Sequence, residues 1–215
     1  MHYGLFLHGV GTQRAGYSAK AREWLTGVLP AFASQEVVWA PVLDAFETDM
    51  LATVKRGGSN NRPMQRFVVN VLADALSYRH RQDQIFELID QSYCRLRAPG
   101  GVTIFAHSLG ALLALEWLRA RPTVQVDKLV TFGVNLQLFY LGGDFVSPAQ
   151  VAAPGCWVNA FSDTDALGWP LRGWLPHVRD VEVNVGGLFS RWNGLAHTAY
   201  FDSRRFWRNT VPSLL

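Results

Sequence analysis

Short apolar runs alternate along the chain with longer segments in which apolar residues recur at helical spacing. The runs have the length of buried strands, whereas the intervening segments have the three-and-four periodicity of amphipathic helices. We expect strands at Tyr3–Leu7, Glu36–Val42, Val102–Phe105, Lys128–Val134, Cys156–Phe161 and Asp180–Val185. Strands that alternate with helices predict an α/β fold, built as a doubly wound, mainly parallel sheet of about six strands.

Helical segments are expected between and beyond these strands. Ser18 has the residue type of an N-cap, and the apolar residues of Ala21–Leu29 lie along one face of the helix that would follow it. The segment Met64–Arg97 has a helical pattern throughout, and a strongly helix-forming apolar run follows Ser108. A last helix is expected from Asp202 onward.

A chain of 215 residues favours one domain, and no repeat or linker divides it. We therefore expect residues 1–215 to form a single domain, with cap or lid segments at 43–66 and 135–155. The second of these is apolar without periodicity, which is typical of a wall or lid over a substrate site. The same pattern also fits a loop that merely covers the core.

Composition narrows the possible partners. Hydrophobic residues make up 49% of the chain and charged residues 17%, as in an ordinary globular protein. The net charge is only +3 and the basic residues are scattered, so no basic stripe indicates nucleic-acid binding. No segment reaches the roughly 18 apolar residues of a membrane span. The oligomeric state is left open by the sequence.

The two cysteines bear on the compartment. Cys94 and Cys156 are isolated, in apolar or helical contexts, without the spacing of metal ligands. Two buried free thiols are therefore expected, which favours a reducing compartment. The N-terminal apolar run leads directly into a motif that the fold needs, so it is not interpreted as a secretion signal. We expect a cytoplasmic protein.

The segment Ala106–Gly110 joins a β-branched strand to the apolar helix and carries Ser108 on the turn. A nucleophile on such an elbow needs small residues two positions before and after it, because larger side chains there would collide. Ala106 and Gly110 meet this requirement. The serine hydroxyl should project above the sheet edge, beside the amide of Leu109 at the start of the helix, where donors lack intrahelical partners.

Gly9 and Gly11 follow the first expected strand. A dinucleotide fingerprint would place a third glycine where Arg14 stands, and the chain has no Gly-Lys-Ser/Thr of a P-loop. These glycines are better interpreted as letting a backbone N–H, that of Val10, face an active site. His8 is expected to brace this turn.

Carboxylates and a histidine follow the later strands. Asp163 and Asp165 come after the fifth expected strand, and His197 comes after the sixth. Because parallel strands end at one edge of the sheet, these groups should meet Ser108 there. The order Ser, Asp, His is a known order for a nucleophile triad. Both carboxylates could face the site, since side chains two positions apart on an extended chain share a side.

These residues resemble the motifs of the α/β-hydrolase family, specifically of compact bacterial lipases and esterases that lack the first two strands of larger members. The likeness covers essentially the whole sequence, although Ala106 stands where glycine is commoner. The resembling segments are the oxyanion turn His8–Gly11, the elbow Ala106–Gly110, the acid loop Asp165–Pro170 and the base loop Ala196–Tyr200. The resemblance implies the strand order 2-1-3-4-5-6, and it favours Asp165 over Asp163 as the acid.

The resemblance also implies a serine carboxylic-ester hydrolase that forms an acyl-enzyme and needs neither a metal nor an organic cofactor. Ser108 would be the nucleophile, His197 the base, and Asp165 the acid that orients it. The amides of Val10 and Leu109 would hold the oxyanion. His107 is expected to be structural and to point elsewhere.

The expected substrate is a small-molecule ester with an apolar acyl group. The residues expected to shape its cleft are Phe139, Tyr140, Leu141, Leu167, Leu188 and Phe189. The same triad could serve thioester cleavage or acyl transfer, which the sequence does not separate from ester hydrolysis. A hydrolase-fold protein that only binds a partner is a further alternative.

Overall fold

A computed structural model describes residues 1–11, 13–43, 77–98, 101–137, 156–186 and 195–215. Its sheet has six strands in the order β2-β1-β3-β4-β5-β6, and each neighbouring pair runs parallel. The strands are β1 (His2–Leu7), β2 (Phe32–Val37), β3 (Val102–His107), β4 (Val126–Phe132), β5 (Cys156–Phe161) and β6 (Arg179–Glu182). The α/β class, the parallel sheet and the order 2-1-3-4-5-6 are thereby confirmed.

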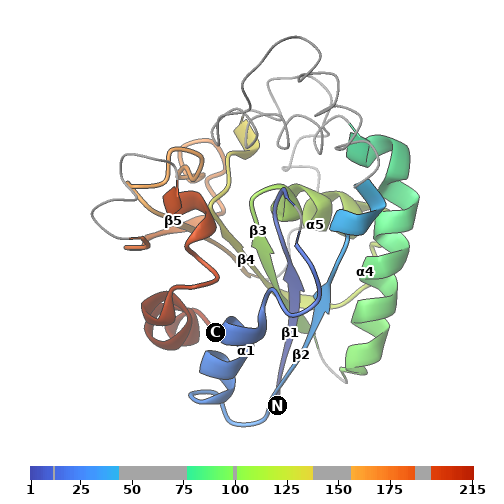
Figure 1. Cartoon of the computed structure of the whole chain (residues 1–215), viewed down its shortest axis with the longest axis horizontal. Coiled ribbons are helices and arrows are strands. Elements are labelled where there is room, and N and C mark those ends of the chain that lie inside the picture. Colours follow the sequence, from blue (N-terminus) through green and yellow to red (C-terminus); the bar gives the residue numbers. More distant parts are fainter. Residues whose placement is uncertain (12, 44–76, 99–100, 138–155, 187–194) are drawn as a thin grey trace.

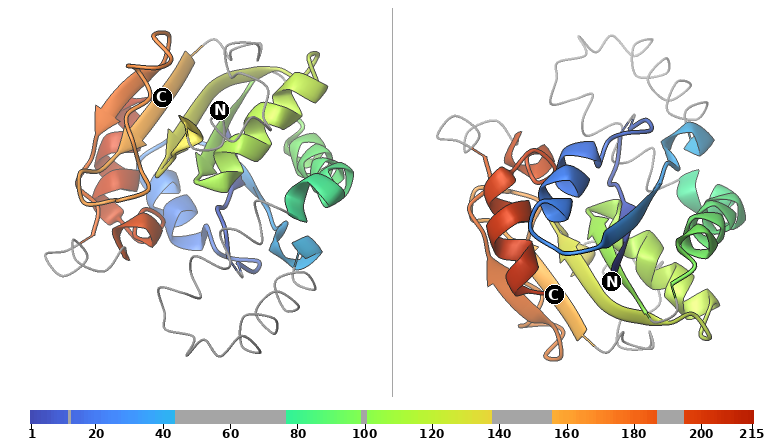
Figure 2. Two further views of the ribbon diagram at one scale, coloured as in Figure 1. Left: turned by 90° about the horizontal axis from the view of Figure 1, so that it is seen from above. Right: turned by 90° about the horizontal axis from the view of Figure 1, so that it is seen from below.

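Helices cover both faces of this sheet (Figures 1 and 2). Helices α4 (Gln82–Leu96) and α5 (Leu109–Ala120) lie on one face, with the 3₁₀ turn η1 (Tyr78–Arg81) leading into α4. Helix α1 (Ala19–Thr26) lies on the other, beside the C-terminal helical segments η5 (Phe206–Thr210) and η6 (Val211–Ser213). A short turn, η4 (Leu195–Thr198), precedes them.

Each face of the sheet has its own hydrophobic core. Along β1, Leu5 and Leu7 belong to the core under α4 and α5, whereas Phe6 belongs to the core under α1 and η5. This alternation follows from the period of two of a strand, and burial of both faces explains the unbroken apolar runs. The second core is rich in aromatic rings, for example Phe6 stacked on Phe105 with centroids 4.9 Å apart.

The bounds of several strands differ from expectation. β2 is Phe32–Val37 rather than Glu36–Val42, because an edge strand tolerates polar residues and the apolar segment after it leaves the sheet. β4 begins two residues earlier than expected, β6 ends earlier, at Glu182, and β5 has the bounds predicted.

Some local expectations also change. Ser18 occupies the N-cap position of α1, but its hydroxyl donates to the Glu36 carboxylate at 2.6 Å instead of capping the helix. Cys94 and Cys156 are free as expected, yet neither is buried: the first is exposed and the second half-buried. The expected cap segments 43–66 and 135–155 lie almost wholly outside the described residues. Within the described ranges, no helix is long and apolar enough to cross a membrane.

Candidate active site

Ser108 lies on a sharp turn between β3 and α5. Its backbone has φ 52° and ψ −124°, a left-handed φ that costs energy for any residue with a side chain. The turn is held by the Ser108 N–H, which donates to the Phe132 carbonyl at 3.1 Å. Gly110 must be glycine, because a Cβ there would overlap the carbonyl oxygen of His8. Strand, strained turn and helix form the expected elbow.

The structure brings Ser108, His197 and Asp165 together. Ser108 Oγ lies 3.0 Å from His197 Nε2, and His197 Nδ1 lies 3.1 Å from each Asp165 carboxylate oxygen. Because a carboxylate only accepts, Nδ1 carries the proton and Nε2 is free to accept from the serine hydroxyl. His197 and Asp165 are buried, at 2% and 3% exposed, while Ser108 is half-buried.

Asp165 is held as an anion. Leu167 N–H donates to its Oδ1 at 2.9 Å, and its own N–H donates to the Ser162 carbonyl at 3.0 Å. Burial opposes ionisation, but the hydrogen bond and charge of His197, together with the Leu167 amide, outweigh it and lower the pKa of the Asp165 carboxyl. Asp163, the alternative acid, is exposed.

His8 organises the turn after β1. The Trp39 main-chain N–H donates to His8 Nε2 at 3.3 Å, so Nδ1 carries the proton and donates to the Gly9 carbonyl at 2.7 Å. Burial lowers the pKa of His8 to about 4, so the ring is neutral. A trans peptide holds its C=O and N–H on opposite sides, so the Val10 N–H points away from the His8 ring. Gly9 packs against Ser108, where an added Cβ would lie 2.7 Å from the serine Cβ.

Trp39 supports this turn, a role that the sequence analysis missed. Its indole stacks on the His8 ring with centroids 4.4 Å apart and planes 12° apart. Its Nε1–H donates to the His8 carbonyl at 3.1 Å. In the sequence, Trp39 stands inside the strand expected at Glu36–Val42, and that position does not reveal a partner 31 residues away.

His107 departs from expectation. Its ring does not point away from the site but packs beside His197, with centroids 4.7 Å apart. Its Nε2–H donates to the His197 carbonyl at 2.8 Å. Burial, followed by the neighbouring His197, lowers the pKa of His107 to about 3, so this ring too is neutral.

Little of the expected acyl cleft can be located. Leu167 is half-buried and contributes the amide that binds Asp165. The other residues predicted for the cleft lie outside the described residues, namely Phe139, Tyr140, Leu141, Leu188 and Phe189.

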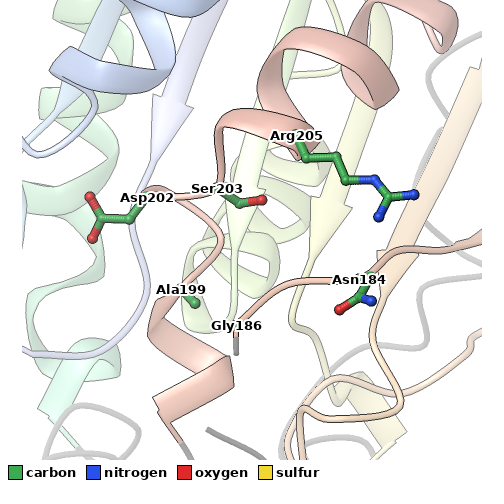
Figure 3. Close-up of a pocket in the computed structure, with 6 residues that line it drawn as sticks. All are labelled: Asn184, Gly186, Ala199, Asp202, Ser203 and Arg205. Atoms are coloured by element: carbon green, nitrogen blue, oxygen red, sulfur yellow. The ribbon is translucent and has the colours of Figure 1, made fainter. Parts of the chain in front are cut away.

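A polar hollow of about 450 Å³ lies beyond the end of β6 (Figure 3). Its lining residues are Asn184, Gly186, Ala199, Asp202, Ser203 and Arg205. The Asp202 side chain points to the opposite side from Arg205, and its carboxylate binds Lys20 at 2.7 Å. The hollow is lined by none of the expected triad residues.

Comparison with known proteins identifies similar structures but no similar sequences. No protein-family model matches the sequence, and no curated protein matches it. Solved structures match over nearly the whole chain. A protein from Xanthomonas campestris pv. campestris, assigned to the alpha/beta hydrolase superfamily, is 13% identical, with a TM-score of 0.52 over 99% of both chains.

Two further structures are similar at lower scores. An α/β serine hydrolase without a lid, also from Xanthomonas campestris, is 12% identical, with a TM-score of 0.44 over 99% of this chain and 82% of its own. A monoacylglycerol lipase from Paleococcus ferrophilus is 12% identical, with a TM-score of 0.43 over 93% of this chain and 92% of its own. The likeness to the first of the three structures, together with the strand order β2-β1-β3-β4-β5-β6, shows that this chain has the α/β-hydrolase fold.

Proposed function

We propose that this chain is a serine hydrolase that cleaves carboxylic esters of apolar acyl groups through an acyl-enzyme intermediate. The observation that carries the proposal is the hydrogen-bonded line from Ser108 through His197 to Asp165, with contacts of 3.0 and 3.1 Å. Nucleophile, base and orienting acid in mutual contact are the signature of nucleophilic acyl chemistry.

Acylation starts with attack by Ser108 Oγ on the ester carbonyl carbon, while His197 Nε2 takes the hydroxyl proton. The carbonyl oxygen becomes an oxyanion, and the amides of Val10 and Leu109 donate to it, each contributing on the order of 3 kcal/mol. The intermediate then collapses, the bond to the alcohol breaks, and the imidazolium gives its proton to the leaving oxygen. The acyl group is left on Ser108.

Deacylation repeats these steps with water as the nucleophile. His197 takes a proton from water, whose oxygen attacks the acyl carbon, and the same proton then returns to Ser108 Oγ as the acid leaves. Asp165 stays ionised throughout and stabilises the charged imidazole, in keeping with the lowered pKa of its carboxyl. Every atom needed for this cycle is supplied by the side chains, two amides, the ester and water.

The apolar acyl preference rests on residues in the sequence segments after β4 and β6, and on half-buried Leu167 beside the acid. Apolar side chains on the carboxyl edge of the sheet would bind an acyl chain by removing it from water. We also propose a cytoplasmic location, which is supported by the two free cysteines.

The proposal is tested by labelling with a fluorophosphonate probe and mapping the modified residue. Ser108 should be modified, and Ser108→Ala should remain folded but lose labelling and ester turnover, by on the order of 10⁶-fold in kcat. Ser213→Ala is the matched control, because Ser213 is exposed at the C-terminal end and contacts only Thr210 among the described hydrogen bonds. Labelling that persists at another serine in Ser108→Ala would contradict the proposed mechanism.

A panel of esters and thioesters that differ in acyl length defines the substrate class. Short and medium apolar acyl esters should react faster than charged or very polar ones. Faster turnover of thioesters, or transfer to an added alcohol in preference to water, would reassign the same triad to a thioesterase or an acyltransferase. A folded protein that neither turns over any of these substrates nor reacts with the probe would favour a binding role.

A further inference from the structure

His107 is a buried histidine that the proposed mechanism does not use. It precedes the nucleophile, is only 5% exposed, and lies between the turn after β1 and the base loop. On one side its Nδ1 faces Gly9, where an added Cβ would come within 2.8 Å of the ring nitrogen. On the other side its Nε2 reaches the His197 carbonyl at 2.8 Å.

Close packing fixes the direction of this imidazole. It stacks on Phe132 with centroids 5.3 Å apart. The Tyr200 ring lies tilted to it and the Phe201 ring meets it in a T-shaped arrangement, each with centroids 5.7 Å away. Gly133, with φ 61°, leaves room beside Nε2, because a Cβ there would lie 3.0 Å from that nitrogen. A ring confined on these sides keeps its donor aimed at one acceptor.

The protonation state follows from the partner. The His197 carbonyl can only accept, so Nε2 of His107 must carry the hydrogen. The pKa of His107, lowered to about 3 by burial and by His197, keeps the ring uncharged at neutral pH. A second positive charge 4.7 Å from His197 would disfavour the imidazolium that acylation forms, and this arrangement avoids it.

We propose that His107 is a positioning residue, whose Nε2–H holds the main chain of His197 and thereby sets the reach of the His197 imidazole to Ser108. The expected effect of His107 on the reaction rate rests on the proposed function, whereas its expected effect on the position of His197 does not. This hydrogen bond adds a main-chain contact at His197 to the contacts that its imidazole makes with Ser108 and Asp165. A shift of about 1 Å in a reacting group can lower a rate by about 10²-fold.

Two substitutions separate the hydrogen bond from the packing. His107→Phe keeps an aromatic ring of similar size but removes the donor. His107→Gln keeps a donor, because its amide nitrogen is as many bonds from Cα as Nε2 is. His177→Phe is the matched control, since His177 is exposed and its ring meets Trp157, away from Ser108.

Three readouts are compared in the full chain: kcat and KM on a reactive ester, the inactivation rate by a fluorophosphonate, and the NMR resonance of the proton between His197 and Asp165. His107→Phe should lower kcat and the inactivation rate by roughly 10- to 100-fold, with KM within about twofold. It should also shift or broaden the shared-proton resonance. His107→Gln should stay within about threefold of the wild type in rate and retain the resonance.

Several outcomes overturn the proposal. One is a folded His107→Phe with wild-type rates and an unchanged resonance. Another is a His107→Gln that loses as much as His107→Phe, because the donor would then not be the cause. If the wild type neither turns over esters nor reacts with the probe, the proposed function fails, while the resonance comparison still decides whether His107 positions His197.

Discussion

Two pairs of segments meet at Ser108, and they are held together by different contacts. One pair is the turns after β1 and β3, and the other is the loops after β5 and β6. β1 and β3 are paired neighbours in the sheet, and their turns touch backbone to backbone. Gly9 and Gly110 allow this approach, since a Cβ on either would overlap the other turn. By contrast, β4 lies between β3 and β5, so Asp165 and His197 reach Ser108 from more distant strands.

The second pair of loops is held by polar contacts rather than by close backbone packing. Asp165 accepts from His197 and from the Leu167 amide, and the His197 carbonyl accepts from His107. The turns around Ser108 therefore require glycines, which have no Cβ to obstruct their close approach. The loops that carry Asp165 and His197 instead require hydrogen-bond donors and acceptors. Different substitutions should break the two pairs, and the predictions below are ordered by expected effect.

The largest of these effects is expected at the acid. Asp165→Asn should lower kcat by roughly 10³- to 10⁴-fold with little change in KM, because an amide no longer favours the tautomer with Nδ1 protonated. The exposed Asp163 provides the matched change, and Asp163→Asn should stay within about twofold of the wild type. Steady-state kinetics on both variants decide the assignment. A large loss confined to Asp163→Asn would reverse it.

A smaller effect is expected when an atom is added to the turns around Ser108. In Gly9→Ala the new Cβ would meet Ser108 Cβ at 2.7 Å and His107 Nδ1 at 2.8 Å. We expect a stability loss of about 1–3 kcal/mol and a kcat about 10²-fold lower, because the elbow must shift. Gly173→Ala is the control, since nothing lies within 4 Å of its added Cβ. Wild-type urea unfolding and kinetics in Gly9→Ala would contradict the steric account.

The smallest effect concerns the response of stability to pH. His8 and His107, with pKa values lowered to about 4 and about 3, stay neutral when folded, whereas an unfolded histidine binds a proton near pH 6.5. The stability that these two neutral rings contribute is thus fully present above about pH 6.5 and is lost as the pH drops toward their pKa values in the folded state. At pH 5 the loss is about 2 kcal/mol for each histidine.

Urea unfolding of the wild type and of His107→Gln at pH 7 and pH 5 measures this contribution. The variant should lose about 2 kcal/mol less stability on acidification than the wild type. Carboxyl groups titrate lower: hydrogen bonds outweigh burial at Asp165 and Glu36 and lower both pKa values, so their contribution is lost only at more acidic pH. Equal pH dependence of the two proteins would show that His107 is not neutral in the folded state.

Much of the fold could be predicted from the sequence because β1, β3, β4 and β5 are central strands. Burial on both faces makes such strands apolar runs with visible ends, and the bounds of β5 agree with the prediction. The edge strand β2 was misplaced because its residues are of mixed polarity and the more apolar segment follows it. The hydrophobic pattern alone does not show where a strand at the edge of the sheet begins and ends.

The candidate site also has a part that could be predicted from the sequence and a part that could not. The residues expected at the ends of β3, β5 and β6 lie in contact, because parallel topology brings those ends to one edge. The contacts of Trp39 with His8 and of His107 with His197 join segments 31 and 90 residues apart. No local pattern encodes such pairs, because each depends on how closely two separately formed turns approach.

The placement of β1 in the sheet also governs when the site can exist during folding. β1 and β2 can pair early through α1, but β3 joins the other side of β1 only after about a hundred residues, and β5 and β6 must then dock beyond β4. Such long separations along the chain slow the last steps of assembly. A partly assembled chain, with the first four strands in place, would have the Ser108 turn without His197, so the proposed nucleophile would stay unactivated until the final strands are added.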